Sequence, residues 1–176
     1  PGTYRYTAAP PWDNALTSTL VHNTLSVEKL DQMTRAGRFL YLDWAQASPV
    51  ERSRAADGSW QRLCASHSGY RRLGVIHHRQ VTAFQDGRWL VADSLTGRHR
   101  HALTTRLHWL LPDLPWQVDI VPQRLRLELS TPFGAVQLLI HGDAPLQPLL
   151  VRAGELLLGS GEFHPLLGWI SPTYGD

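Results

Sequence analysis

The sequence predicts an all-β fold, built as an antiparallel two-sheet β-sandwich. From about residue 18 onward, short runs of β-favouring residues alternate with Gly, Pro, Asp and Ser. Such runs are typical of strands, and the residues between them are typical of turns. Stretches with a helical period of 3.6 residues are scarce, and the best of them, 32–38, is short enough to be a loop. Many strands joined by long loops favour a sandwich over a small closed barrel.

The expected strands are short and end at turn residues. In 124–129, charged residues alternate with leucines, which puts the charges on one face and the leucines on the other. Asp86-Gly87 predicts a tight hairpin between 73–84 and 89–94, because glycine reaches a positive φ without a Cβ clash. The segments 10–12 and 48–58 are expected to be extended loops. The full set of expected strands is 19–27, 39–45, 73–84, 89–94, 102–110, 116–121, 124–129, 135–141 and 149–157.

Length and composition indicate one domain of a longer polypeptide. The chain has 176 residues, of which 43% are hydrophobic, enough for one core. No apolar run approaches the roughly 18 residues of a membrane helix, and the first residues lack a signal-peptide pattern, so no membrane partner is expected. The chain starts at Pro1 and enters patterned sequence at once, so we expect a further region before it. Nothing in the chain itself indicates a compartment.

Charge and cysteine content exclude little, but they disfavour a nucleic-acid partner. The formal net charge is +2, and no dense block of Lys and Arg interleaved with aromatic residues is present. Lys29 is the only lysine, so the basic residues are nearly all arginine, which binds carboxylates and sulfates in a bidentate manner. Genome composition explains the same bias equally well. The single Cys64 cannot form an internal disulfide and is expected to be a buried thiol.

Polar residues inside apolar runs are the candidates for chemistry. His22 and Asp43 each stand in a run that reads as a strand, and a carboxylate buried there needs a partner. His77 and His78 are adjacent in a third run, so their side chains point to opposite faces. Two imidazoles and one carboxylate on separate strands are a ligand set that suits zinc, with a fourth position left open. The spacing fits no local ligand motif, so hydrogen-bonded or surface histidines are the alternative for His22, Asp43 and His77.

Several short motifs run from one end of the chain to the other. They are Gly2-Thr3-Tyr4-Arg5-Tyr6, Pro10-Pro11-Trp12, His22-Asn23-Thr24, 67–75, His77-x-Arg79 and 168–175. In this order they resemble the C-terminal domain of the heparinase II/III-like polysaccharide lyases. The resemblance implies a β-sandwich that follows an N-terminal α/α toroid, with an acidic polysaccharide bound between the two parts. That toroid is absent from this sequence and is expected as a partner in the same chain.

The resemblance also implies a reaction, which is β-elimination of a uronic-acid-containing polysaccharide. A base removes the C5 proton, an acid assists the leaving oxygen, and neutralisation of the uronate makes the proton more acidic. Most of the catalytic Asn, His and Tyr residues are expected on the toroid, so the isolated domain should be inactive. The substrate, whether a glycosaminoglycan, alginate or another uronan, is not indicated. A periplasmic or secreted location is implied by the resemblance alone.

The resemblance assigns roles to particular residues. A structural zinc ion is implied at His22, Asp43 and His77, with His78 as the alternate ligand if the register is shifted by one residue. Some family members carry a catalytic histidine two positions before the metal histidine, but Leu20 stands there, so that strand has no expected acid or base.

Other residues are candidates for contact with the sugar. Tyr70 is a candidate catalytic tyrosine, although an aromatic residue beside a turn glycine also suits packing. The candidates for a sugar-binding edge, each with solvated surface as the alternative, are Tyr4, Arg5, Tyr6, Arg71, Arg72 and Arg79. The remaining histidines, His99, His101, His108, His141 and His164, are expected at the surface or in the core. The alternative for the whole domain is a carbohydrate-binding or structural sandwich without metal and without catalysis.

Overall fold

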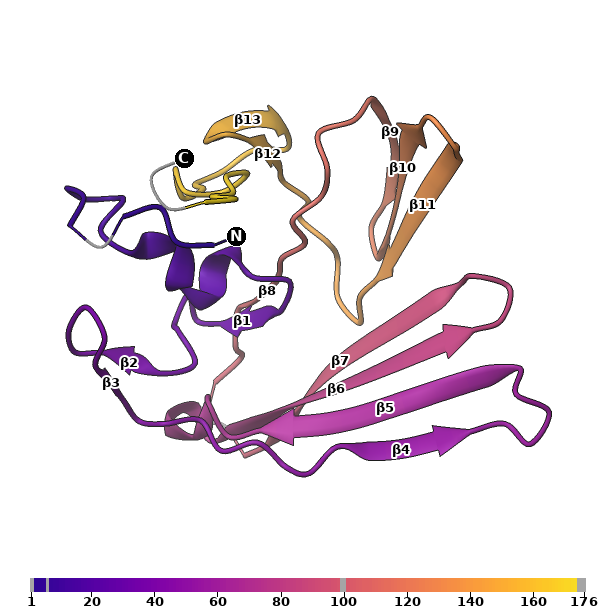
Figure 1. Cartoon of the computed structure of the whole chain (residues 1–176), viewed down its shortest axis with the longest axis horizontal. Coiled ribbons are helices and arrows are strands. Elements are labelled where there is room, and N and C mark those ends of the chain that lie inside the picture. The colour runs from indigo at the N-terminus through magenta and orange to yellow at the C-terminus, as the bar shows by residue number, and fades with distance from the viewer. Residues whose placement is uncertain (1, 6, 99–100, 174–176) are drawn as a thin grey trace. The chain divides into compact units, whose positions relative to one another are not determined.

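The computed structural model describes residues 2–5, 7–98 and 101–173 and confirms the all-β class (Figure 1). Within these residues every pair of strands is antiparallel, as in a β-sandwich, and the helical structure consists of short 3-10 turns. None of the described helices is long and apolar enough to cross a membrane. The chain divides into two compact units, one formed by Pro1–Thr17 with Trp109–Asp176 and the other by Ser18–His108. The expectation of one domain in a longer chain stays a prediction.

The largest sheet belongs to the Ser18–His108 unit, and its strand order is β4-β5-β6-β7. The hairpin predicted around Asp86-Gly87 is confirmed, since β6 and β7 pair along most of their length and Gly87 has φ 86°. Bending the chain at a positive φ there is easy for glycine. The strands are β4 (Glu51–Arg54), β5 (Trp60–His67), β6 (Val75–Phe84) and β7 (Trp89–Gly97).

Two small ladders complete this unit. β1 (Leu25–Val27) pairs with β8 (Thr105–Leu107), and β2 (Thr34–Arg35) pairs with β3 (Tyr41–Leu42). Its core forms where β1 and the start of β6 meet the 3-10 turn η3 (Arg71–Leu73). The fully buried members are Val27, Tyr70 and Val75, packed against Leu25, Leu73, Leu95 and Leu103.

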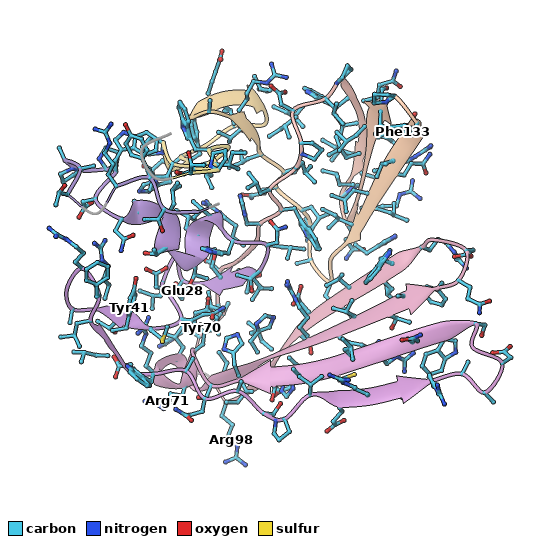
Figure 2. The ribbon with its side chains drawn as sticks, viewed as in Figure 1. Glu28, Tyr41, Tyr70, Arg71, Arg98 and Phe133 are labelled. Carbon is cyan, nitrogen blue, oxygen red and sulfur yellow. The ribbon has the colours of Figure 1, made fainter. Side chains whose placement is uncertain are left out.

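The other unit contains a three-stranded sheet in the order β11-β10-β9. The predicted alternation over 124–129 is confirmed, because the three leucines of that run are buried and its arginines are exposed. Phe133, in the turn after β10, is fully exposed (Figure 2). The strands are β9 (Trp116–Val121), β10 (Arg124–Thr131) and β11 (Gly134–His141), followed by the hairpin β12 (Leu150–Arg152) and β13 (Glu155–Leu158).

The strand predicted over 19–27 is wrong for most of its length. Only Leu25–Val27 (β1) forms a strand, and Thr19–Val21 forms the 3-10 turn η2. The Ser18 hydroxyl accepts a hydrogen bond from the Leu20 N–H, and the Asp31 carboxylate accepts one of 2.6 Å from the Thr19 N–H. Local side-chain acceptors therefore take the backbone donors that a strand would offer to a neighbour.

Other boundaries differ for reasons of local backbone geometry. The predicted strand 39–45 shrinks to β3, after which Asp43 has a left-handed φ of 54°. The predicted strand 149–157 is two strands, since Ala153 and Gly154 both have positive φ, as a tight hairpin turn requires. The expected strand 102–110 contracts to β8.

Three strands were not predicted. β2 lies inside 32–38, which was expected to be a loop. β4 lies inside the expected loop 48–58, and β5 follows β4. The four residues of β4 are polar and exposed because β4 is an edge strand, where polar and charged side chains are favoured. The sequence of a polar edge strand therefore resembles that of a loop.

Candidate functional site

Four polar side chains gather on one face of the β5–β6–β7 sheet. His67 lies opposite His77 in the register, and in the next row Arg79 lies opposite Asp93. Side chains two residues apart on a strand point to the same face, so the His77-x-Arg79 spacing brings both to this face. His77 and Asp93 are buried, with side chains 2% and 6% exposed. We call these four residues the histidine–aspartate–arginine network.

Hydrogen bonds run through this network in one direction. Asp93 has only acceptor atoms, so His77 Nε2 donates to Asp93 Oδ1 at 2.7 Å and, in the neutral ring, His77 Nδ1 is an acceptor. His67 Nε2 then donates to His77 Nδ1 at 2.9 Å. His67 Nδ1 in turn accepts the Gly69 N–H at 3.1 Å. One pair of neutral tautomers, each protonated at Nε2, satisfies all four ring nitrogens.

Gly69 makes this contact possible because it has no side chain. A Cβ at this position would lie 2.9 Å from the Gln32 Cβ and 3.0 Å from His67 Nδ1. Such distances are too short for ordinary packing, so a larger residue would push the loop away from His67. The His67-Ser68-Gly69 sequence therefore fixes the first link of the network.

The electrostatics of the network agree with a neutral His67 and an ionised Asp93. Burial, together with the nearby His77 and Arg79, lowers the pKa of His67 to about 4. Burial alone would raise the pKa of Asp93, but hydrogen bonds from His77 and Arg79 and the charge of Arg79 outweigh it and lower that pKa to about 2. At neutral pH His67 is therefore neutral and Asp93 ionised, beside the guanidinium of Arg79.

Arg79 connects the network to another segment of the chain. Its Nε and Nη2 atoms donate to the two oxygens of Asp93 at 2.7 and 2.8 Å, which is the bidentate arrangement that guanidinium and carboxylate favour. Its Nη1 atom donates to the backbone carbonyl of Asn23 at 2.6 Å. The predicted contact of Arg79 with a sugar is untested, and its guanidinium is engaged within the protein.

His22 lies in the segment that Arg79 reaches. It follows η2 instead of standing in a strand, its side chain is exposed, and its Nδ1 lies 2.8 Å from the Ser18 carbonyl. Because a carbonyl only accepts, Nδ1 carries a proton, and in a neutral ring Nε2 would be the acceptor. His108 lies beside this segment, with its Nδ1 3.1 Å from the His22 carbonyl. Burial lowers the pKa of His108, which favours its neutral form.

The predicted zinc ligands have separate partners in this structure. The Asp43 carboxylate is 57% exposed, accepts a hydrogen bond of 2.8 Å from the Thr34 hydroxyl and lies 4.0 Å from Arg72. His77 uses both ring nitrogens in the network. Within the described ranges, no three His, Cys, Asp or Glu side chains form a group that could hold a metal. As arranged here, His22, Asp43 and His77 do not fit a zinc ion, and zinc binding stays a prediction.

His78, the alternate ligand, lies on the opposite face from His77, as the alternation of the strand predicts. Its Nε2 is 2.6 Å from the Thr96 hydroxyl on β7. In the register observed, His77 and not His78 faces the network, so His78 lies on the face away from His67 and Asp93.

Tyr70 is a core residue. Its side chain is fully buried against Val27 and Val75, and its hydroxyl donates to the Leu25 carbonyl at 3.2 Å (Figure 2). Burial raises the pKa of Tyr70 to about 12. A phenol held in this way has no access to a sugar, so the geometry supports the packing alternative. The catalytic role is untested.

The candidates for a sugar-binding edge fall in different units. In the first unit, Arg5 stacks over the Tyr4 ring at 5.0 Å, and Tyr4 packs edge-on against Trp12 at 5.9 Å. Tyr6 lies outside the described residues. In the second unit, Arg71 and Arg72 belong to η3 and are bound to the backbone or side chains of Trp44, Asp31 and Thr34.

Sequence reasoning missed three residues of this site, which are His67, Asp93 and His108. Asp93 stands in an apolar run, and the argument that a buried carboxylate needs a partner applies to it as well as to Asp43. His67 stands two residues before a glycine in a motif that the resemblance already singled out. No pattern in the sequence connects His108 to His22.

The fold and this network define an all-β domain whose polar centre lies on a sheet face. The chain matches the family described as "Heparinase II/III-like, C-terminal" over residues 1–175 and belongs to that family. No curated protein and no solved structure gives a significant match. The resemblance found in the sequence is thereby confirmed for the whole chain.

We expect the stability of the chain to fall as the pH drops from 6.5 toward 4. The unfolded chain protonates His67 near 6.5, but the folded chain does so only near 4, so the unfolded state binds more protons between these values. Urea unfolding across this range measures the slope. His67→Gln should flatten it, whereas His78→Gln, on the other face of the sheet, should leave it. Equal slopes in all three proteins would contradict a neutral, half-buried His67.

His77→Gln should destabilise the chain, and its metal content tests the predicted zinc ligand set. Glutamine cannot accept from His67 and donate to Asp93 in the geometry of the ring, so one buried group loses its partner at a cost of about 1–3 kcal/mol. Thermal unfolding and elemental analysis of the purified variant measure the two effects. If the parent chain holds one zinc per molecule and His77→Gln loses it, the ligand set of His22, Asp43 and His77 would be restored.

Proposed function

We propose that this chain is the C-terminal part of a polysaccharide lyase that cleaves a uronic-acid-containing polysaccharide by β-elimination. The observation that carries the proposal is the family match over residues 1–175. Heparinase II/III-like proteins are named for an activity on acidic polysaccharides, which is the substrate class proposed for this protein.

The arginine-rich composition supports an acidic partner. Every basic residue except Lys29 is an arginine, and guanidinium groups pair with carboxylates and sulfates in a bidentate manner. Arg71 is exposed at η3, and its guanidinium lies 3.5 Å from the Trp44 carbonyl. Trp44 is 67% exposed, so an exposed aromatic residue and an arginine that contacts its backbone occur together, which suits an acidic sugar.

The geometry favours an accessory role over a complete active site. β-Elimination needs a base, an acid and a group that neutralises the uronate. The tyrosine expected to act, Tyr70, is buried, and the network histidines donate and accept within the protein. We therefore infer that most of the reacting groups belong to another part of the full-length protein.

A non-catalytic carbohydrate-binding module is the second candidate, and one observation favours it. Tyr4, Trp12 and Trp169 form an edge-on aromatic cluster in the first unit, with ring centroids 5.9 and 5.3 Å apart. Trp169 is 39% exposed, and Arg5 stacks on Tyr4. Exposed aromatic rings next to a guanidinium suit the face of an acidic sugar without any chemistry. The lyase proposal includes a structural zinc ion, and the binding-module proposal does not.

We expect the full-length protein to release unsaturated uronate products from at least one uronan, while residues 1–176 alone release none. β-Elimination creates a C4–C5 double bond that absorbs in the ultraviolet, so a panel of heparan sulfate, alginate and other uronans can be screened directly. Mixing this chain with the separately produced remainder of the protein controls for activity lost only because the two parts were separated.

If both the full-length protein and the isolated chain bind the polysaccharide but release no unsaturated product, the binding-module proposal would replace the lyase proposal. Product from the isolated chain would contradict the accessory role.

A further inference from the structure

The segment His22-Asn23-Thr24 is irregular, yet each of its backbone carbonyls accepts a hydrogen bond. The His22 carbonyl accepts from the Thr24 N–H at 2.7 Å and lies 3.1 Å from His108 Nδ1. The Asn23 carbonyl accepts from Arg79 Nη1 at 2.6 Å, and the Thr24 carbonyl from the His108 N–H at 3.1 Å. The donors come from two positions distant in sequence, so the segment is held from two sides.

We propose that Arg79 and His108 are positioning residues, which hold the backbone of His22-Asn23-Thr24 so that the exposed His22 ring keeps a fixed direction. The inference rests on the proposed function, because it assigns the held segment to the site where the polysaccharide reacts. Neither residue touches the reacting atoms. Arg79 is thereby removed from the sugar-binding edge and given a role inside the protein.

The orientation of the His22 ring is the reason that its position matters. The hydrogen bond from Nδ1 to the Ser18 carbonyl keeps a proton on Nδ1 and fixes which edge of the ring faces Ser18, so Nε2 lies on the edge away from that carbonyl. The side chain is exposed, so a bound molecule can reach the ring. A backbone that shifts by a fraction of an ångström would redirect Nε2, because the ring follows the backbone of its own residue.

The composition of the network favours positioning over stabilisation. An ion pair with a buried carboxylate, beside one buried and one half-buried imidazole, gains little stability over apolar residues of similar size. The network does fix the orientation of the Arg79 guanidinium. Two of its N–H groups donate to Asp93, and a third donates to the Asn23 carbonyl. Asp93 is itself fixed by His77, and His77 by His67. The sheet face therefore determines where the Asn23 carbonyl lies.

Hydrogen exchange in residues 1–176 tests, without any need for activity, whether Arg79 and His108 hold the backbone of His22-Asn23-Thr24. We call this arrangement the clamp. In Arg79→Lys the single ammonium cannot bind both Asp93 oxygens and the Asn23 carbonyl. We expect the amides of 22–25 to exchange about tenfold faster or more, with the β10 amides unchanged. Arg62→Lys is the matched control, since Arg62 lies on the other face of the same sheet and bonds Thr82. Equal exchange at 22–25 in both variants would overturn the clamp.

Kinetics of the full-length protein test whether the clamp matters for the proposed reaction. We expect Arg79→Lys and His108→Ala to lower kcat about 10- to 100-fold with a smaller change in KM, as misplacement of a reacting group does. Arg62→Lys should retain the parent kcat. Faster local exchange with an unchanged kcat would overturn the role in positioning. A parent protein without lyase activity would overturn the proposed function instead, and the exchange experiment would still decide whether the clamp exists.

Discussion

The carboxylate of Asp93 is the constraint on which the site depends. It is nearly removed from solvent and accepts three hydrogen bonds, one from His77 and two from Arg79. A carboxylate in such a place is tolerated only when its partners are present and correctly oriented. Every other assignment in the network follows from it, because an acceptor at one end determines which nitrogen of each ring carries a proton.

This directionality separates residues that look alike in the sequence. His77 and His78 are neighbours, but one belongs to the network and the other bonds to Thr96 on the opposite face. Arg79 binds the Asn23 carbonyl, whereas Arg71 is exposed beside Trp44. The lyase proposal thus draws on two kinds of arginine, one that organises the protein and one that is available to an acidic sugar.

The sequence predicted the class of fold, the β6–β7 hairpin and the two-faced strand 124–129, because alternation and turn glycine are local signals. It failed at Thr19–Val21, where side chains of Ser18 and Asp31 cap a 3-10 turn. Long-range partners were the harder part of the site. His67 and Asp93 meet His77 only through strand register, which no local pattern encodes. The family likeness pointed to the correct family but left the partners of each side chain to the structure.

Long-range proton–nitrogen NMR of the imidazole rings tests the network most directly. At neutral pH we predict that His67 and His77 are both neutral, each with a protonated Nε2 and an unprotonated Nδ1. That pattern is required if hydrogen bonds run from Gly69 through both rings to Asp93. A proton on Nδ1 of either ring, a doubly protonated ring, or rapid averaging between tautomers would contradict the network and everything inferred from it.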